Sequence, residues 1–425
     1  MKLVNNLEKR IGEKFDKKQE FVPGKSTISL IEPSFGKDEV IEALDSLLST
    51  NVTMGKKVRK FESLFSSYLK SKHAVMVNSG SSANLVALSA LTNPWFKKQL
   101  KKNTEVITPA VTWATTIYPI QNLNLKPKFV DIDLEDFCMQ TDNLDDVISS
   151  KTSLILPVHL LGNVCNMDRI NEVAKKNNLL VMEDCCEAHG AEFKGRKVGT
   201  IGNIGTFSFF LSHHITTIEG GMVTTNDESL SEISKALRAF GWTRDLKNKE
   251  IFAKKSPHID PKFLFVNTGF NLRPTEIQGS FGMHQIGKLE KFIKIRKENH
   301  RFWIKRLSQF SDYFILTREK KNTRPVHFSF PLTIRKESPF NRKDLVNFLK
   351  KAKIETRPVM GGNFSEQPAM QFIPYSKYGK LSNSKLAMTN SFFFGNHQNI
   401  GKIQREYVVD AISKFIDCKL WKKSK

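Results

Sequence analysis

The sequence has few cysteines and no long apolar run. Five cysteines occur among 425 residues, and no two of them form a C-x-x-C pair. This sparse, odd-numbered set argues against a disulfide framework and against a structural zinc site, and predicts reduced thiols. No stretch reaches the roughly eighteen apolar residues that span a bilayer, and the charged start MKLVNNLEKRIGEKF does not resemble a signal peptide. We therefore expect a cytoplasmic protein without a membrane partner.

Acidic residues are scarce relative to basic ones. The chain has 43 Asp and Glu against 66 Lys and Arg, a formal net charge of +23. Nucleic-acid-binding proteins often carry such a charge, but they concentrate it on one face or in a recognised motif. Here the lysines are spread along the chain, with short runs at 97–102 and 419–425. We therefore expect no nucleic-acid partner, and the positive field would favour an anionic small substrate.

Apolar strand-like runs alternate with helical stretches from about residue 74. The runs are HAVMVN, EVITPAV, PKFVDID, SLILPVHLLG and LLVMED, and the amphipathic stretch MDRINEVAKKNN separates the last two. Such alternation predicts an α/β fold built from βαβ units with a mostly parallel sheet. The 40% hydrophobic content is ample for its core.

The pattern changes from Pro274 onward. A long helical stretch is followed by the alternating run VHFSFPLTI and by the helical run RKDLVNFLKKAKI, which together predict a smaller α+β domain. We expect an N-terminal arm at 1–30 and a large domain at 31–280. A long connecting helix and a small C-terminal domain are expected at 281–425.

Three predicted strand ends carry residues suited to a planar anionic ligand. The turn NSGSSAN (78–84) precedes a helix, whose free N–H groups and dipole can bind a phosphate, although helix capping alone commonly explains such a turn. Asp184 ends a buried strand and could hold a protonated ring nitrogen, or serve as a helix cap or salt-bridge partner. Trp113 could stack on a planar cofactor or belong to the core.

The segment FSFFLSHHITTIEGGMV (207–223) adds Ser208 and two adjacent histidines. A single histidine in such a place is more often structural than catalytic, but these four elements follow in chain order at the strand ends of one sheet. With them, the sequence resembles the sugar aminotransferase family of fold-type I pyridoxal-phosphate (PLP) proteins, the DegT/DnrJ/EryC1/StrS type. The resemblance continues through VTMGKKVRKFE, GWTRD and GFNLRP to FFFGNHQ, and covers nearly the whole chain beyond residue 30.

The resemblance implies a large domain with a mostly parallel mixed sheet between helices, and it assigns roles to individual residues. The cofactor phosphate would be held by four residues of one subunit, Gly80, Ser81, Ser82 and Ser208. Asn271 would reach the same phosphate from the neighbouring subunit, which implies a homodimer with shared active sites. For the rest of the site, the implied contacts are Trp113 on the pyridine ring, Asp184 on its nitrogen, Glu187 at its hydroxyl and Arg244 at the substrate's nucleotide phosphates.

His213 occupies the position of the family's cofactor-binding lysine. Within the family this exchange marks the keto-sugar 3-dehydratases. Imidazole forms no stable Schiff base, but it accepts and donates protons near neutral pH. His214 is expected to be structural, because adjacent residues of an extended turn point apart.

The implied reaction is removal of the C3 hydroxyl from a nucleotide-linked 4-keto-6-deoxy sugar, foremost GDP-4-keto-6-deoxy-D-mannose, for deoxysugar and lipopolysaccharide O-antigen synthesis. L-Glutamate would convert non-covalently bound PLP to pyridoxamine phosphate (PMP). His213 would remove the cofactor methylene proton and deliver a proton to the departing hydroxyl. Ammonia would be released at the end.

Two positions depart from related branches. Phe240 stands where the dehydratase branch is expected to have histidine, which predicts a difference in the substrate pocket. Cys186 could match one ligand of the iron–sulfur cluster of the CDP-sugar 3-dehydrases, but residues 241–271 contain no cysteine. Four thiolates cannot be assembled, so neither a cluster nor another metal is expected.

Two alternatives stay open. A nucleotide-sugar 4-aminotransferase would need a different lysine at the cofactor, and none occurs in residues 207–223. A PLP or nucleotide-sugar binding protein without turnover would tolerate histidine at position 213. GDP as the nucleotide rests on the resemblance alone.

Overall fold

The computed structural model describes residues 2–16 and 20–421. Its largest sheet has eight strands in the order β1-β9-β8-β5-β4-β2-β3-β14. β9 pairs antiparallel with both of its neighbours, and the remaining pairs are parallel, as predicted for a mostly parallel sheet. The strands are β1 (His73–Val77), β2 (Glu105–Pro109), β3 (Lys126–Val130), β4 (Thr152–Ile155), β5 (Leu180–Asp184), β8 (Ile204–Ser208), β9 (Gly221–Thr225) and β14 (Ser376–Lys377).

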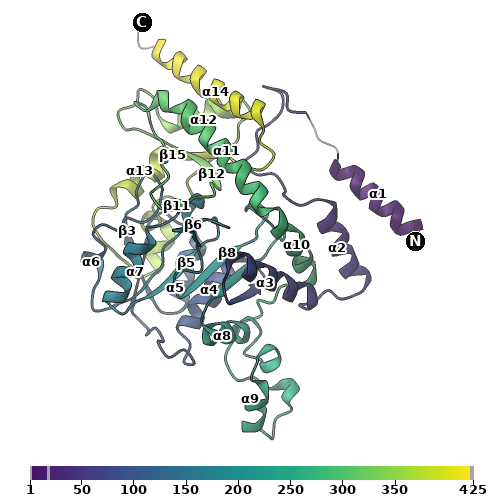
Figure 1. Ribbon diagram of the computed structural model, residues 1–425. Coiled ribbons are helices and arrows are strands. Elements are labelled where there is room, and N and C mark those ends of the chain that lie inside the picture. Colours follow the sequence, from purple (N-terminus) through teal and green to yellow (C-terminus); the bar gives the residue numbers. More distant parts are fainter. Residues whose placement is uncertain (1, 17–19, 422–425) are drawn as a thin grey trace.

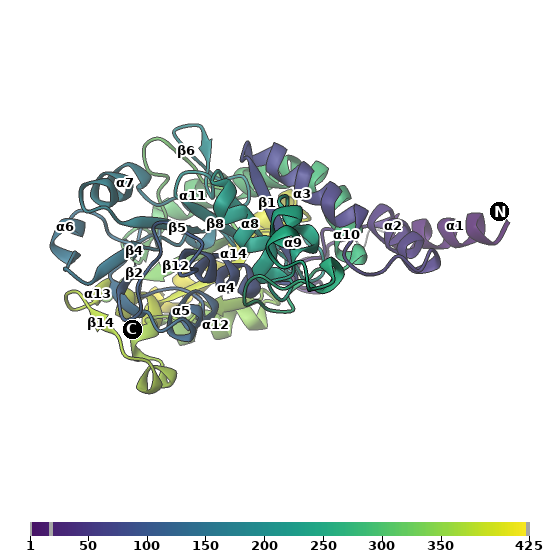
Figure 2. The ribbon, with the colours of Figure 1, turned by 90° about the horizontal axis from the view of Figure 1, so that it is seen from below.

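Helices cover both faces of this sheet (Figures 1 and 2). The central strands β5, β8 and β9 are buried along their whole length, as expected for strands that helices cover on both faces. One hydrophobic core joins the sheet to α4, α5 and α8, and a second joins the opposite face to α3 and α7. The helices are α3 (Lys56–Leu69), α4 (Gly80–Leu91), α5 (Ala114–Asn122), α6 (Leu144–Val147), α7 (Met167–Lys176), α8 (Glu228–Arg238) and α9 (Lys249–Lys255).

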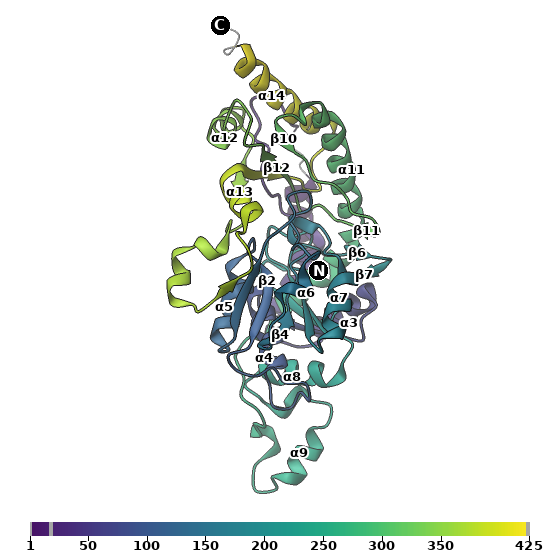
Figure 3. The same cartoon turned by 90° about the vertical axis from the view of Figure 1, so that its left-hand side faces the viewer.

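A smaller layer lies beyond the carboxyl ends of the large sheet. Its four-stranded antiparallel sheet has the order β10-β12-β15-β13 and shares a third core with α11, α12 and α14. Figure 3 shows α12 and α14 at one end of the molecule and α9 at the other. The elements are β10 (Phe314–Ile315), β12 (Ser329–Ile334), β13 (Thr356–Pro358), β15 (Ser391–Gly395), α10 (Glu276–Gln285), α11 (Leu289–Leu307), α12 (Arg342–Lys351), α13 (Ser382–Asn390) and α14 (Lys402–Trp421).

A small sheet and an N-terminal helix complete the architecture. A three-stranded sheet joins β11 (Thr323–Arg324) to β6 (Glu192–Phe193) and β7 (Arg196–Lys197). The N-terminal helix α1 (Lys2–Asp16) packs beside α2 (Lys37–Leu48) and projects from the body in Figure 2. No helix of the described residues combines the length and apolar character needed to cross a membrane.

Candidate active site

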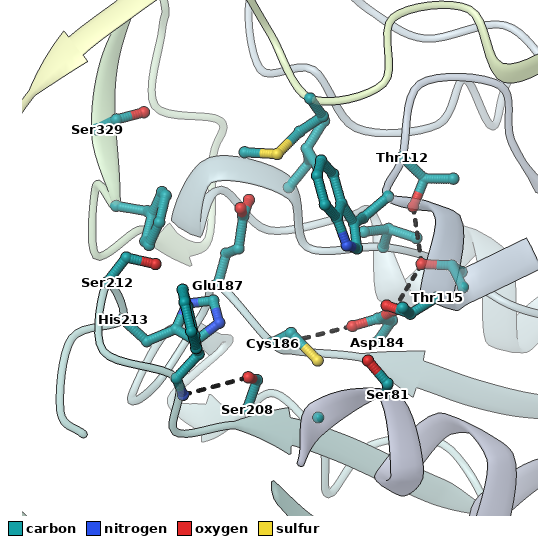
Figure 4. Close-up of a pocket in the computed structure, with 18 of the residues that line it drawn as sticks. Ser81, Thr112, Thr115, Asp184, Cys186, Glu187, Ser208, Ser212, His213 and Ser329 are labelled. Carbon is teal, nitrogen blue, oxygen red and sulfur yellow. Dashed lines mark hydrogen bonds between the residues drawn. The ribbon is translucent and has the colours of Figure 1, made fainter. Parts of the chain in front are cut away.

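The ends of four strands meet at one cavity. Because β1, β2, β5 and β8 run in the same direction, their carboxyl ends lie at one edge of the large sheet, where open α/β sheets bind ligands. The cavity there has a volume of about 500 Å³. Of the predicted site residues it brings together Gly80, Ser81, Trp113, Asp184, Glu187, Ser208 and His213. Figure 4 shows Asp184, Glu187 and His213 around the same space.

The N-terminus of α4 forms one end of the cavity. Ser79 caps this helix by accepting a hydrogen bond from the Ser82 backbone N–H at 3.1 Å. Gly80 lies against Ser208 so closely that a Cβ on Gly80 would be 2.3 Å from the Ser208 Cβ. The unsatisfied N–H groups of a first helical turn, together with the Ser81 and Ser208 hydroxyls, suit a phosphate. Ser82 does not line the cavity, because its hydroxyl donates to Asn78 Oδ1 at 2.6 Å.

Asp184 is a buried carboxylate at the end of β5, with 4% of its surface exposed. Its Oδ2 accepts hydrogen bonds from Asn84 Nδ2 and Thr116 Oγ1, both at 2.9 Å, and its Oδ1 accepts one from the Cys186 N–H at 3.2 Å. Among the described residues, no basic side chain forms an ion pair with it. A buried carboxylate without a cation is costly, and a protonated pyridine nitrogen in the cavity would supply the missing charge.

Glu187, on the segment that follows β5, also lines the cavity. Its Oε2 accepts a hydrogen bond from the Leu161 N–H at 2.7 Å. Burial raises the pKa of Glu187 to about 8, opposed by that hydrogen bond and aided by the charge of Asp184. The side chain is therefore protonated at neutral pH and can donate a hydrogen bond to a ring oxygen.

Trp113 is the N-cap residue of α5, and 58% of its surface is exposed although it is one of the largest apolar side chains. It lines the cavity instead of the core. An indole in that position presents a face on which a planar ring can stack.

His213 lies on the loop between β8 and β9. Its Nδ1 is buried without a hydrogen-bond partner among the described residues, and its ring packs 5.5 Å from that of Phe328 between centroids. Burial, aided by the charge of Arg296, lowers the pKa of His213 to about 3. The imidazole is therefore neutral at pH 7 in the cofactor-free cavity. His214 lies outside the cavity lining, with Nε2 3.2 Å from the Val326 carbonyl oxygen.

The structure does not bring Asn271 or Arg244 to this cavity within one chain. Asn271 Oδ1 accepts a hydrogen bond from Arg273 Nε at 3.2 Å. Arg244, in the short helix η2 (Thr243–Asp245), stacks over Trp242 with its guanidinium carbon 5.3 Å from the ring centroid. Phe240, which is also absent from the lining, adopts a left-handed φ of 63° and lies under the guanidinium of Arg273.

Several residues that line the cavity were not identified from the sequence. Arg296 and Phe328 come from the C-terminal third, as do Ser329 and Arg357. Arg296 is buried and donates from Nη1 to the carbonyl oxygens of Phe328 and Asn396, and burial lowers its pKa to about 9. No local motif marks these residues.

The DegT/DnrJ/EryC1/StrS aminotransferase family matches residues 33–413. The chain belongs to this family. Its relatives include GDP-4-keto-6-deoxy-D-mannose 3-dehydratase of Escherichia coli O55:H7, 40% identical over 363 residues, which are 84% of this chain and 92% of the relative. The enzyme of the same name from Yersinia pseudotuberculosis is 39% identical over 369 residues, or 85% and 92% of the two chains.

Solved structures of this family give the same result for the fold. The E. coli GDP-4-keto-6-deoxy-D-mannose-3-dehydratase with bound hydrated PLP matches with a TM-score of 0.86 and 36% identity, covering 91% of this chain and 99% of the other. A histidine-to-asparagine variant of the same enzyme with bound GDP-perosamine matches with a TM-score of 0.85, covering 91% and 100%. The predicted family and the predicted fold class are confirmed.

Proposed function

We propose that the protein is a PLP-dependent 3-dehydratase of GDP-4-keto-6-deoxy-D-mannose, acting in the cytoplasm in deoxysugar and lipopolysaccharide synthesis. L-Glutamate is the amino donor, and ammonia and a 4-keto-3,6-dideoxy sugar are products. The observation that carries the proposal is His213, a neutral imidazole in the cavity where the family's aminotransferases place a lysine. The relatives that match this chain over most of its length are named for this activity.

The residues of the cavity suit the cofactor. When bound, PLP supplies an electron-withdrawing ring that stabilises negative charge on the carbon next to its amino group. Asp184 would hold the ring nitrogen protonated, and Glu187 would donate to the ring hydroxyl. Ser81 and Ser208, with the N-terminus of α4, would bind the phosphate, and Trp113 would cover one face of the ring.

His213 moves the protons of the reaction. From its place beside Phe328, it would accept a proton from the carbon next to the ring. It would then give a proton to the C3 hydroxyl, which would leave as water. Because imidazole is not a primary amine, His213 could not release an amino sugar from the cofactor by forming a Schiff base in its place.

No lysine lines the cavity among the described residues, which argues against the aminotransferase alternative. The alternative of binding without turnover predicts no proton transfer. His213 lines the cavity with a buried Nδ1 that has no hydrogen-bond partner among the described residues, a placement that suits proton transfer and that binding alone does not require.

We also propose a homodimer in which Asn271 of one subunit completes the phosphate site of the other. Two observations support this. Asn271 lies outside the cavity of its own chain, and its segment GFNLRP is part of the family resemblance. Sedimentation, which reports the oligomeric state, and PLP titration, which reports the affinity, test the proposal on the wild type and on Asn271→Ala. A dimer in both, with weaker PLP binding in the variant, is expected, and a monomeric wild type with full PLP affinity would contradict it.

The function is tested by incubating the protein with PLP, L-glutamate and GDP-4-keto-6-deoxy-D-mannose and measuring the mass of the sugar product. A nucleotide sugar that has lost the C3 oxygen is expected. A sugar that has gained nitrogen would mean transamination. If 2-oxoglutarate forms and the sugar is unchanged, the amino donor is right and the sugar is wrong.

A further inference from the structure

Two buried histidines lie face to face behind the wall of the catalytic cavity. His300 is on α11 with 4% of its surface exposed, and His327 precedes β12 with 3% exposed. Their ring centroids are 3.6 Å apart and the ring planes differ by 10°. Glu319, on the loop between β10 and β11, has Oε1 3.2 Å from His327 Nε2. One ligand atom from each of the three lies within 4.8 Å of the others.

We propose that His300, Glu319 and His327 bind a zinc ion at a site separate from the cofactor cavity. Two imidazoles and one carboxylate are a common zinc ligand set. In a tetrahedral site with bonds of about 2.0–2.1 Å, neighbouring ligand atoms are about 3.3 Å apart. The present separation between His327 Nε2 and Glu319 Oε1 is 3.2 Å, so these two atoms need little movement, and the Nε2 proton would move to Nδ1 when the metal binds.

His300 must turn to complete the site. The lone pairs of stacked parallel rings run side by side and do not converge on one point. The Nε2 atom of His300 now lies 2.9 Å from Thr317 Oγ1, and a rotation of its ring would exchange this hydrogen bond for the metal. The Glu319 side chain is 35% exposed, which leaves a path for the ion and room for water as the fourth ligand.

The charges around the site act in opposite directions. Glu319 contributes a carboxylate to the three ligand groups. The positive charges of Lys297 and Arg301 act on the same groups and oppose the ion.

A second cluster of ligand-type side chains is a poorer candidate. His159, Glu183 and Cys185 also lie within reach of one another, but all three are wholly buried. Glu183 already accepts hydrogen bonds from the N–H groups of Gly199, Ile201 and Gly202. The carboxylate of Glu183 is therefore already occupied by hydrogen bonds, and a metal ion has no path from solvent to this buried cluster.

A zinc ion at this site would stabilise the wall of the catalytic cavity. His327 has a left-handed φ of 48°, and the next residue is Phe328, whose ring packs against His213. A bound ion would join α11, the Glu319 loop and the start of β12, and so fix the strained residue beside that wall. No metal was expected from the sequence, and the proposed zinc site departs from that expectation because residues 300, 319 and 327 form no local sequence motif.

Zinc chloride titrated into the metal-stripped protein, with a chromophoric zinc indicator as competitor, tests the proposal. One zinc per chain is expected. Glu319→Gln, on a half-exposed loop where folding is not at risk, lowers the affinity at least about tenfold, since loss of even outer partners of a metal costs that much. His284→Gln is the matched control, because His284 Nε2 lies 3.4 Å from Glu42 Oε2 without a second histidine. It should bind zinc like the wild type.

Cobalt(II) in place of zinc identifies the ligands. The expected spectrum has visible bands of a nitrogen and oxygen site and no thiolate charge-transfer band, and His327→Asn, which tolerates the left-handed backbone, abolishes it. A thiolate band would place the metal at cysteines and overturn the proposal. Equal zinc affinity in the wild type, Glu319→Gln and His327→Asn would also overturn it.

Discussion

Gly80 and Ser208 lie in such close contact that the first has no room for a side chain. A Cβ on Gly80 would be 2.3 Å from the Cβ and 2.6 Å from the Oγ of Ser208. The two residues come from the start of α4 and the end of β8, and their approach forms the phosphate end of the cavity.

Gly80→Ala should therefore weaken PLP binding roughly tenfold to a hundredfold, because overpacking of this size costs about 1–3 kcal/mol and displaces Ser208. Absorbance titration with PLP measures the affinity. Gly287→Ala is the control, because nothing lies within 4 Å of a Cβ there. Wild-type affinity in Gly80→Ala would show that the phosphate binds elsewhere.

His213→Asn should lower kcat by roughly a hundredfold to ten-thousandfold, the usual contribution of a positioned general base. PLP affinity should remain, because the histidine makes no proposed contact to the phosphate or the ring nitrogen. Steady-state kinetics and PLP titration measure the two effects. The exposed His258→Asn serves as the control, and unchanged kcat in His213→Asn would remove the residue from the mechanism.

Asp184→Asn keeps the shape of the side chain and removes its charge. The amide could still accept from Thr116, but it could not hold a pyridine nitrogen protonated. Loss of a hydrogen bond between charged groups should lower kcat/KM roughly tenfold to a hundredfold. The absorbance spectrum of bound PLP should shift as well. A smaller change than that of Thr116→Val, which removes only a supporting hydrogen bond at 2.9 Å, would contradict the assigned role.

Glu187 gives a prediction about stability and pH. Its pKa rises from 4.5 to about 8 in the folded protein, so the folded chain binds this proton more tightly than the unfolded chain does. Its contribution to stability is complete below pH 4.5 and is lost as the pH rises toward 8.

Glu187→Gln cannot ionise and should therefore raise Tm relative to the wild type at pH 8, with a smaller difference at pH 4.5. Thermal unfolding of the metal-free, cofactor-free protein at both pH values measures this. Glu250→Gln, on the exposed helix α9, controls for general charge effects. An equal Tm difference at both pH values would show that Glu187 does not titrate in this range.

Much of the site could be predicted because its residues follow strands that run in one direction. Asp184, Ser208 and Trp113 each stand at or just after a strand end, so a parallel sheet must bring them to one edge. The exchange of lysine for His213 was visible in the sequence alone. The domain boundaries and the roles of the individual site residues remain predictions.

The other half of the cavity could not be predicted from local patterns. Arg296 and Arg357 reach the cavity because the small domain packs over the strand ends, a long-range arrangement without a sequence motif. The two-residue strand β14 is too short for any periodicity, yet it joins the edge of the large sheet beside β3. The side chain of Ser82, in the first turn of α4, donates to Asn78 Oδ1 at 2.6 Å, a contact that the sequence does not reveal.

The measurement that tests the central claim most directly is the ratio of ammonia to 2-oxoglutarate over many turnovers with L-glutamate and GDP-4-keto-6-deoxy-D-mannose. An enzyme that uses His213 to remove the C3 hydroxyl and keeps no nitrogen in its product should release the two in equal amounts. 2-Oxoglutarate without ammonia, with the nitrogen recovered in the sugar, would contradict the account.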